Sequence, residues 1–548
     1  MSNQVPQSLE ETEIFQNNSN LVDFFNTACR RHKDGIAFES YDVGMSYSQL
    51  SDRANHLASW FSKNANVGDK VAVMMPNMMA YPVIVYGALK AGMTVVNINP
   101  LYTKRELEHV LKDSGARILL CWEGAGHVVA SADLASVDKV VLTTIGDLLG
   151  FKGKIINFVA KRIKKLVPKF SLANTLAFSG VIQEGSKDAF TDIDLPIEHM
   201  AFLQYTGGTT GVSKGAVLTH RNIMANVAQC CYACDPKLME IVDNEQKIGI
   251  CPLPLYHIFA LTAHNFYLFY YGAKNVLITN PRDLKTFVSI LQKNKFHFIS
   301  AVNTLFESLL NNEDFKKLDF SNLVTALAGG MAALPSTAEK WQSVTKSVMM
   351  QAYGLTETSP LVSAVSYEES TFSGSIGKSA LFTEVEIRDD NDQLLSTGEA
   401  GELCVRGPQV MQGYWKTKDS GVDENGWFKT GDIATIDESG NIFIVDRKKD
   451  MIIVSGFNVY PNEVEAVVAE HPAVMECGCI GVENEKSEEA VKVFAVLHEG
   501  QSLTAEELIT FCREKLTAYK VPKHVAFIEE LPKTNVGKVL RRELKNLN

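Results

Sequence analysis

The sequence predicts an α/β protein of at least two domains, in which mainly parallel sheets are covered by helices. The first half of the chain alternates short β-rich runs with segments of helical periodicity, a pattern typical of parallel sheets layered with helices. The chain has 548 residues, which is too long for one ordinary hydrophobic core. Both observations favour a multidomain globular protein.

Three short apolar runs predict the strands of the first sheet. We expect these strands at residues 70–75, 94–98 and 117–121, where valine, isoleucine, leucine and methionine predominate. Short apolar runs of this kind are typical of buried strands. A later strand is expected at residues 442–445, directly after a Gly-Asn pair.

A helix is predicted between the second and third of these strands. Thr103 and Glu106 form a capping box, in which each side chain accepts a hydrogen bond from the other residue's backbone N–H. Gly115 supplies a stop, because glycine readily adopts the left-handed conformation of a helix end. The apolar face of this helix consists of Leu107, Val110 and Leu111.

Residues 151–170 differ from the rest of the chain because they contain basic residues and no acidic one. In a helical projection, apolar residues share one face and basic residues the other, as in helices that lie in a membrane interface. Each basic residue near an anionic leaflet contributes at most about 1 kcal/mol, so several together could hold the protein reversibly. A helix docked on the protein's own core is an equally good interpretation. The apolar face comprises Ile155, Ile156, Val159, Ile163, Leu166 and Val167, with Phe158 outside it, and the basic residues are Lys152, Lys154, Lys161, Arg162, Lys164, Lys165 and Lys169.

Residues 248–273 contain no Asp, Glu, Lys or Arg and are long enough to span a bilayer. Two prolines and the polar residues His257, His264 and Asn265 interrupt both the apolarity and the continuity of a helix. We therefore predict a buried strand, loop and helix that line an apolar cavity, and no transmembrane helix.

The charge balance and the N-terminus restrict the partners and the compartment. A net charge of −11 argues against general nucleic-acid binding, which favours basic surfaces. The first residues carry glutamates and no basic segment followed by an apolar stretch, so no signal peptide is expected. We expect a cytoplasmic protein, with a peripheral contact on the inner face of an anionic membrane if residues 151–170 bind lipid.

Residues 205–216, with the sequence YTGGTTGVSKGA, combine glycines, hydroxyl side chains and one lysine. Glycines let backbone N–H groups approach anionic oxygens, threonines add donors and a hydroxyl for a metal, and Lys214 adds positive charge. A Walker loop requires Gly-Lys-Ser/Thr, whereas Lys214 lies between Ser213 and Gly215, and no GxGxxG motif occurs here. Alone, such a stretch is more often an ordinary loop, but it is also a candidate nucleotide site.

Four further blocks accompany this stretch in a fixed order. Together the five resemble the adenylate-forming superfamily, which joins acyl-CoA synthetases, luciferases and the adenylation domains of peptide synthetases. The run from Asn425 to Pro461 is similar to the signature of bacterial long-chain fatty-acid–CoA ligases. The four blocks are QAYGLTET at 351–358, KTGD at 429–432, DRKKD at 446–450 and PKTNVGK at 532–538.

The resemblance implies an ATP-dependent enzyme that activates long-chain fatty acids to acyl-CoA through an acyl-adenylate, releasing AMP and pyrophosphate. Fatty acid, ATP and coenzyme A would be its substrates and Mg²⁺ its metal. The ionised acid must approach an anionic phosphate, and unit charges about 4 Å apart at an effective dielectric of about 20 repel by about 4 kcal/mol, so one lysine or metal is decisive. The alternatives are a medium-chain or aryl acid–CoA ligase, an enzyme that loads a carrier protein, and a membrane-bound lipid-binding protein without catalysis.

The resemblance also implies roles for individual residues. Thr206 and Glu357 would hold Mg²⁺, and Thr356 would lie beside the α-phosphate. Asp432 would bind the ribose hydroxyls, since a carboxylate can accept two hydrogen bonds at once, and Arg447 would support the ribose. The phosphates would be bound by Tyr205, Thr206, Gly207, Gly208, Thr209, Thr210, Gly211 and Lys214, and the adenine framed by Gly329, Gly330, Tyr353 and Gly354.

Four more residues are assigned by the same resemblance. Lys538 would reach the α-phosphate and the substrate carboxylate during adenylation, and Lys449 would be the hinge beside the nucleotide. Gly456 would lie beside the channel for the CoA thiol, and His257 near the acyl pocket, although a core histidine is nearly as good an interpretation. The implied division is a large N-terminal domain at 1–446, a hinge at 447–450 and a small mobile α+β domain at 451–548.

Overall fold

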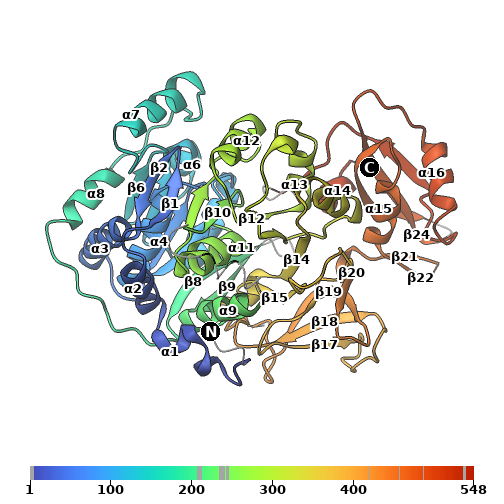
Figure 1. The fold of residues 1–548 in the computed structure, drawn as a ribbon, viewed down its shortest axis with the longest axis horizontal. Helices are drawn as coiled ribbons and strands as arrows, with labels where there is room; N and C mark the ends of the chain where they lie inside the picture. Colours follow the sequence, from blue (N-terminus) through green and yellow to red (C-terminus); the bar gives the residue numbers. More distant parts are fainter. Residues whose placement is uncertain are drawn as a thin grey trace.

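The computed structural model describes residues 5–206, 213–233, 238, 241, 246–418, 420–455, 457–484, 487–534 and 538–547. Figure 1 shows a large body that carries the N-terminal sheets and most of the helices, and a smaller unit at the C-terminal end that carries β21–β24, α15 and α16.

The first sheet has the strand order β7-β6-β5-β3-β4-β8-β9, and every described pair is parallel except β8 with β9. Its central strands lie where the three apolar runs predicted them. The bounds are β3 (Lys70–Met74), β4 (Thr94–Ile98), β5 (Ile118–Trp122), β6 (Lys139–Thr143), β7 (Thr175–Ala177), β8 (Met200–Thr206) and β9 (Lys214–Thr219).

The second sheet has nine strands in the order β16-β15-β14-β13-β12-β10-β11-β1-β2. The five central pairs are parallel, and antiparallel pairs occur at the two ends. The bounds are β1 (Ile36–Ser40), β2 (Val43–Ser46), β10 (Ile248–Cys251), β11 (Lys274–Leu277), β12 (Phe298–Ala301), β13 (Thr325–Ala328), β14 (Met349–Gly354), β15 (Leu361–Ala364) and β16 (Lys378–Ser379).

Helices cover these two sheets, as the alternation in the sequence predicts. Every residue of α4 (Ala80–Lys90) is buried, because its sequence is apolar on all sides and it packs among other elements. Of the others, α3 (Tyr47–Asn64) packs on α4. The remaining long helices are α2 (Leu21–Arg31), α8 (Phe178–Gly185), α9 (His220–Ala233), α12 (Leu284–Lys293), α13 (Asn303–Leu310) and α14 (Pro335–Thr345), and α1 (Glu13–Asn17) and α6 (Gly126–Ser131) are short.

The predicted capping box is confirmed at helix α5 (Lys104–Ser114). Thr103 accepts from the Glu106 backbone, and Glu106 accepts from the backbone of Thr103. Gly115 ends the helix with φ of 68°, in the left-handed region. The predicted apolar face, Leu107, Val110 and Leu111, is buried.

The uncharged segment 248–273 folds as predicted into a buried strand, a loop and a helix. Strand β10 is followed by α11 (Ile258–Ala260) and by the π-helix η4 (Leu261–Leu268). His264 is satisfied inside the core by the side chains of Asn275 and Ser300, at 2.9 and 2.8 Å. Within the described ranges, no helix has the length and apolarity needed to cross a membrane.

The prediction for residues 151–170 is wrong in its extent. Helix α7 (Gly150–Phe158) continues as a π-helix, η3 (Val159–Ile163), and the helical segment ends there. The projection at a constant 3.6 residues per turn therefore does not hold. Ile156 packs partly against the core, whereas Ile155 and Ile163 of the same expected face are exposed. In Figure 1, α7 lies at the outer edge of the large body.

Two further sheets complete the fold. The four strands β17 (Glu384–Arg388), β18 (Gly401–Arg406), β19 (Phe428–Ile436) and β20 (Ile442–Arg447) form an antiparallel sheet that the sequence did not predict, apart from the strand at 442–445. The last sheet has its own hydrophobic core. It contains β21 (Ile452–Val454), β22 (Phe457–Val459), β23 (Val474–Asn484), β24 (Glu488–Leu497) and β25 (His524–Phe527), covered by α15 (Pro461–Ala469), α16 (Ala505–Arg513) and α17 (Arg541–Lys545).

Candidate active site

The predicted phosphate loop lies in the hairpin between β8 and β9. Thr206 ends β8 and Lys214 begins β9, and the two residues are register partners across the hairpin. Tyr205 is buried beside them and donates to the Asp113 carboxylate at 2.5 Å. The predicted loop residues Gly207, Gly208, Thr209, Thr210 and Gly211 lie outside the described residues.

Segment 411–415 connects this hairpin to Glu357. The Met411 N–H donates to the Glu357 carbonyl at 2.8 Å, and the Trp415 N–H donates to the carbonyl of Gly215 in β9 at 2.8 Å. Within this segment the Tyr414 hydroxyl donates to Glu357 Oε1 at 2.7 Å. Lys214 Nζ lies 4.9 Å from the centre of the Tyr414 ring. The Tyr414 side chain thus contacts both Glu357 and Lys214, which are 143 positions apart in the sequence.

The surroundings of Glu357 fit a magnesium ion. Glu357 is only 8% exposed. Among the described residues, the one hydrogen bond to its carboxylate comes from Tyr414. A buried carboxylate with so little compensation favours a cation as partner. Because no described group of three His, Cys, Asp or Glu residues could hold a metal, a metal here would need phosphate and water oxygens as well. This is the ligand set that Mg²⁺ prefers.

Asp432 is held by two predicted site residues. The Tyr353 hydroxyl donates to Asp432 Oδ2 at 2.6 Å, and Arg447 Nε lies 3.5 Å from Oδ1. Asp432 and Arg447 are register partners between β19 and β20. Burial, and secondly the charge of Asp432, raise the pKa of Tyr353, so the phenol stays a donor. Asp432 itself is 6% exposed.

The predicted adenine-framing glycines lie at the ends of neighbouring strands. Gly329 and Gly330 follow β13, and Gly354 ends β14, its parallel neighbour. A Cβ atom on Gly354 would lie 2.0 Å from the Pro360 carbonyl oxygen, so no larger residue fits. Thr356 follows in the 3₁₀ turn η6 (Thr356–Thr358), which also carries Glu357.

Lys538 of the C-terminal unit reaches the same region. Burial, followed by the positive charge of Arg447, lowers the pKa of Lys538 to about 7, while Asp432 acts in the opposite direction. Burial, followed by the charge of Lys538, lowers the pKa of His257 to about 4. Arg447, Asp432 and His257 therefore each lie within electrostatic range of Lys538.

Lys449 lies in the 3₁₀ turn η7 (Lys448–Asp450), directly after β20. Burial lowers the pKa of Lys449. Of the smaller effects, Arg447 lowers this pKa further and Asp432 raises it. The structure thus brings Lys449 towards the same group. Gly456 lies outside the described residues.

Sequence reasoning missed an ionic cluster beside this group. Arg541 of α17 contacts Asp446 at 3.1 Å, Asp450 at 3.2 Å and Glu465 at 2.9 Å. The Asn462 N–H also donates to Asp446 at 2.6 Å. The acidic partners of Arg541 lie 76 or more positions away in the sequence, so no local pattern reveals the cluster.

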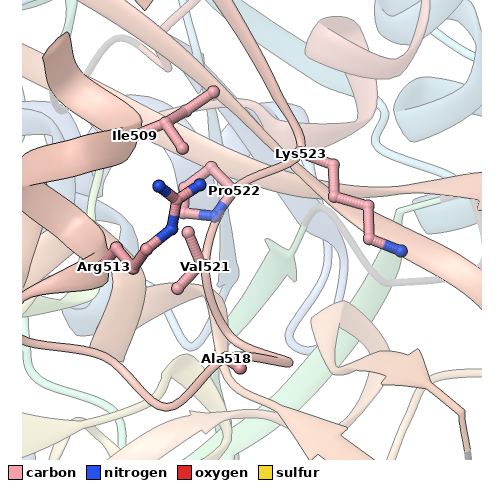
Figure 2. A pocket seen from close by; sticks show the side chains of 6 residues that line it. All are labelled: Ile509, Arg513, Ala518, Val521, Pro522 and Lys523. Atoms are coloured by element: carbon pink, nitrogen blue, oxygen red, sulfur yellow. The ribbon is translucent and has the colours of Figure 1, made fainter. Parts of the chain in front are cut away.

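The pocket drawn in Figure 2 lies away from these residues. It has a volume of about 330 Å³ and is formed by α16 and the segment before β25. None of the predicted site residues lines it; its lining is Ile509, Arg513, Ala518, Val521, Pro522 and Lys523. The candidate active site is therefore defined by the convergence of charged side chains and not by this pocket.

Comparison with known proteins gives the class to which this fold and site belong. The profile of the AMP-binding enzyme family matches residues 25–415, and that of the AMP-binding enzyme C-terminal domain matches residues 463–538. The chain therefore belongs to the AMP-binding enzyme family. This confirms the resemblance drawn from the five sequence blocks.

Individual relatives are similar over nearly the whole chain. The chain is 48% identical over 533 residues to the long-chain-fatty-acid–CoA ligase of Escherichia coli O157:H7, and 49% identical over 534 residues to that of Yersinia pestis. Both alignments cover 96% of this chain and 94% of the relative. The crystal structure of an anthranilate CoA ligase in complex with anthranoyl-AMP has a TM-score of 0.82 at 23% identity, covering 96% of this chain and 97% of that one, which shows the shared fold.

Proposed function

We propose that this protein is an ATP-dependent long-chain fatty-acid–CoA ligase. It forms an acyl-adenylate from fatty acid and ATP with release of pyrophosphate, and then transfers the acyl group to coenzyme A with release of AMP. The observation that carries the proposal is the contact of Tyr353 and Arg447 with Asp432, within electrostatic range of Lys538. The near full-length similarity to long-chain-fatty-acid–CoA ligases supports the choice of substrate.

The side chains around this point match the charges of the first step. The carboxylate of the acid attacks the α-phosphorus of ATP, so negative charge accumulates where these groups meet. Protonated Lys538 offsets this repulsion, as a fixed positive group at developing negative charge does in other enzymes. Asp432 accepts from the ribose hydroxyls, with Tyr353 and Arg447 fixing its orientation.

Thr206 and Glu357 are the residues that hold Mg²⁺ in this proposal. When bound, the metal neutralises phosphate charge and orients the leaving pyrophosphate. Lys214 and the loop from Thr206 onward bind the β- and γ-phosphates. Thr356, on the same turn as Glu357, lies beside the α-phosphate.

The acyl end of the site belongs to the uncharged segment 248–273. Because burial keeps the pKa of His257 near 4, this histidine is neutral at ordinary pH and adds no charge beside Lys538. It then acts as a neutral polar group at the start of the apolar acyl pocket.

The second step uses a different arrangement of the C-terminal unit. We propose a hinge at residues 447–450, with Lys449 as the pivot, an N-terminal domain at 1–446 and a C-terminal domain at 451–548. A rotation there withdraws Lys538 and places the Gly456 loop beside the thiol of coenzyme A. One site then serves both half-reactions.

A panel of acids tests the activity. The purified protein, with ATP, Mg²⁺ and coenzyme A, should release AMP and form acyl-CoA fastest with long-chain fatty acids. Faster turnover of medium-chain or aryl acids would replace the substrate assignment. Adenylate formation without free acyl-CoA, rescued by a carrier protein, would identify the carrier-loading alternative, and no adenylate with any acid would exclude catalysis.

A second proposal concerns an anionic membrane surface. Helix α7, η3 and the residues after them expose five large apolar side chains, Phe151, Ile155, Phe158, Ile163 and Leu166. Phe151 is 78% exposed and Ile163 is 65% exposed. Exposed apolar groups next to lysine and arginine suit the boundary between lipid headgroups and acyl chains.

Ion pairs attach this segment to the body and leave other basic residues for lipid. Lys152, Lys161 and Lys164 contact Asp42, Glu123 and Asp283. Within the described part of the chain, no carboxylate partner is found for Lys154, Arg162, Lys165 or Lys169. We propose that this surface binds the protein peripherally to an anionic membrane on its cytoplasmic side.

Vesicle binding tests this second proposal. The triple variant Arg162→Glu, Lys165→Glu, Lys169→Glu should lose binding to phosphatidylglycerol vesicles and keep activity on fatty acid dispersed in detergent. Parent binding should weaken with salt, because the attraction is screened. The control Lys187→Glu, Lys340→Glu, Lys545→Glu changes the net charge equally at other exposed sites. Equal binding by both triple variants, or no binding by the parent, would contradict the proposal.

A further inference from the structure

We propose that Tyr414 is a positioning residue that holds Glu357 and Lys214 in the geometry needed to bind magnesium and the ATP phosphates. This inference rests on the proposed function, which assigns Glu357 to the metal and Lys214 to the phosphates. Tyr414 belongs to none of the five sequence blocks, and only the fold places it between the two charged residues.

The Tyr414 hydroxyl fixes one side of the Glu357 carboxylate. It donates to Oε1 at 2.7 Å, and a carboxylate has about four lone-pair positions for partners. The remaining positions are left for a cation. In the buried turn that carries Glu357, this hydrogen bond favours one orientation of the carboxylate over the others.

The Tyr414 ring acts on Lys214. The ammonium nitrogen lies 4.9 Å from the ring centre, within the range in which a cation is attracted to an aromatic face. The attraction holds the lysine without neutralising it, in contrast to an ion pair. Lys214 therefore keeps its full charge for phosphate oxygens.

The backbone of segment 411–415 holds Tyr414 in place. The Tyr414 N–H donates to the Ser420 carbonyl at 2.9 Å. Tyr414 also pairs with Ala216 of β9 in an antiparallel bridge. Gly421 packs against the ring so closely that a Cβ atom there would lie 2.7 Å from Tyr414 Cε2. The main chain of Tyr414 is thus held by Ser420 and Ala216, and Gly421 packs against one edge of its ring.

The arrangement also keeps two opposite charges apart. Glu357 and Lys214 both contact Tyr414, and among the described residues no ion pair joins the two to each other. A direct pair would neutralise both groups and would have to break before ATP and magnesium bind. Tyr414 occupies the position between them and so keeps both groups available.

The test measures ATP binding with and without Mg²⁺ in the absence of fatty acid. ATP and Mg²⁺ are each titrated, and the thermal midpoint of every variant reports its stability. Tyr414→Phe removes the hydroxyl and keeps the ring. It should raise the Mg²⁺ concentration for half-maximal ATP binding about fivefold, the net size of one typical intramolecular hydrogen bond. Affinity for ATP without Mg²⁺ should stay at the parent value.

Tyr414→Leu removes the ring as well. It should additionally weaken ATP binding without Mg²⁺ about threefold, since Lys214 loses its cation–π contact. Tyr47→Phe is the matched control, because it also removes a buried hydroxyl, one that donates to the backbone carbonyls of Phe269 and Ala273. The control should lower stability and leave the Mg²⁺ response unchanged.

The double variant Tyr414→Phe, Glu357→Gln separates the two levels of the proposal. If Tyr414 acts through Glu357, adding Tyr414→Phe to Glu357→Gln should not raise the Mg²⁺ concentration for half-maximal ATP binding any further. A Mg²⁺ response unchanged in Glu357→Gln alone would overturn the metal assignment of the proposed function. A shift in Glu357→Gln but none in Tyr414→Phe, or equal shifts in Tyr414→Phe and Tyr47→Phe, would overturn the positioning role.

Discussion

Two parts of the proposed active site are held in place by different means. Glu357 and Asp432 each take a hydrogen bond from a tyrosine of the large body, Tyr414 and Tyr353 respectively. Lys538 instead belongs to the segment that follows the C-terminal sheet, where its own hairpin links it to Thr534 by hydrogen bonds of 2.7 and 3.0 Å. The first group is built into one body, and the second reaches it from another.

Among the described residues, the polar contacts between Lys538's unit and the last strand of the large body centre on Asp446. Asp446 is fully buried. Its carboxylate accepts hydrogen bonds from Arg541 and from the Asn462 N–H, both on the C-terminal side of the predicted hinge. The difference indicates that the residues proposed to bind nucleotide and metal are fixed by packing, while the position of Lys538 depends on how the two units are arranged. The following predictions test that distinction.

The largest effect is expected from Lys538→Ala. Removing one fixed group at developing charge typically costs about 100-fold to 1,000-fold in rate, so adenylation from fatty acid and ATP should fall by that factor. Acyl-CoA formation from preformed acyl-adenylate should largely survive. Acyl-CoA production from acid and ATP at the parent rate would exclude the assigned role.

Lys449→Pro should separate the two half-reactions. Proline fixes φ, and a pivot has to absorb a large change in backbone dihedrals, so we expect thioester formation to slow by at least about tenfold, as for a gating residue. Adenylation, measured by pyrophosphate exchange, should stay close to the parent rate. Equal rates of acyl-CoA formation in variant and parent would place the pivot elsewhere.

Glu357→Gln should raise the Mg²⁺ requirement of adenylation about tenfold, because a metal-facing charge is lost. Asp432→Asn should shift it much less, since an amide oxygen can keep part of the ribose bonding. Magnesium titrations of the two variants side by side give the comparison. Equal Mg²⁺ dependence in Glu357→Gln and the parent would remove Glu357 from the metal site.

The smallest effect concerns pH. With the pKa of Lys538 lowered to about 7, the fraction of free enzyme with a protonated lysine falls about fivefold between pH 7 and pH 8. The kcat/KM for ATP in adenylation should decline accordingly as pH rises. Lys538→Arg should remove this decline, since arginine stays charged, and a decline that persists in that variant would assign the titration to another group.

Much of the fold follows from local patterns in the chain. Thr103, Glu106 and Gly115 define a helix by contacts within a dozen residues, and they hold in the structure. The prediction of a buried strand, loop and helix at residues 248–273 also holds, because proline and buried polar groups oppose a membrane helix wherever they occur. The antiparallel sheet β17–β20 was not predicted, since its pairing joins strands whose partners depend on register.

The error at residues 151–170 has a local and a tertiary cause. The change to a π-helix at Val159 shifts the faces that a regular helix would have. The ion pairs of Lys152 with Asp42 and of Lys161 with Glu123 then decide which side faces the body. Neither partner lies near this segment in sequence, so a helical projection could not include them.

The sequence by itself determined the family, the chemistry and the identity of most proposed site residues, because those residues lie in contiguous blocks whose spacing is fixed along the chain. Only the tertiary structure decided which of them meet: Tyr353 and Arg447 at Asp432, and Tyr414 between Glu357 and Lys214. The physical reason is that hydrogen bonding and charge act over a few ångströms of space, and the fold sets those separations between residues far apart in the chain.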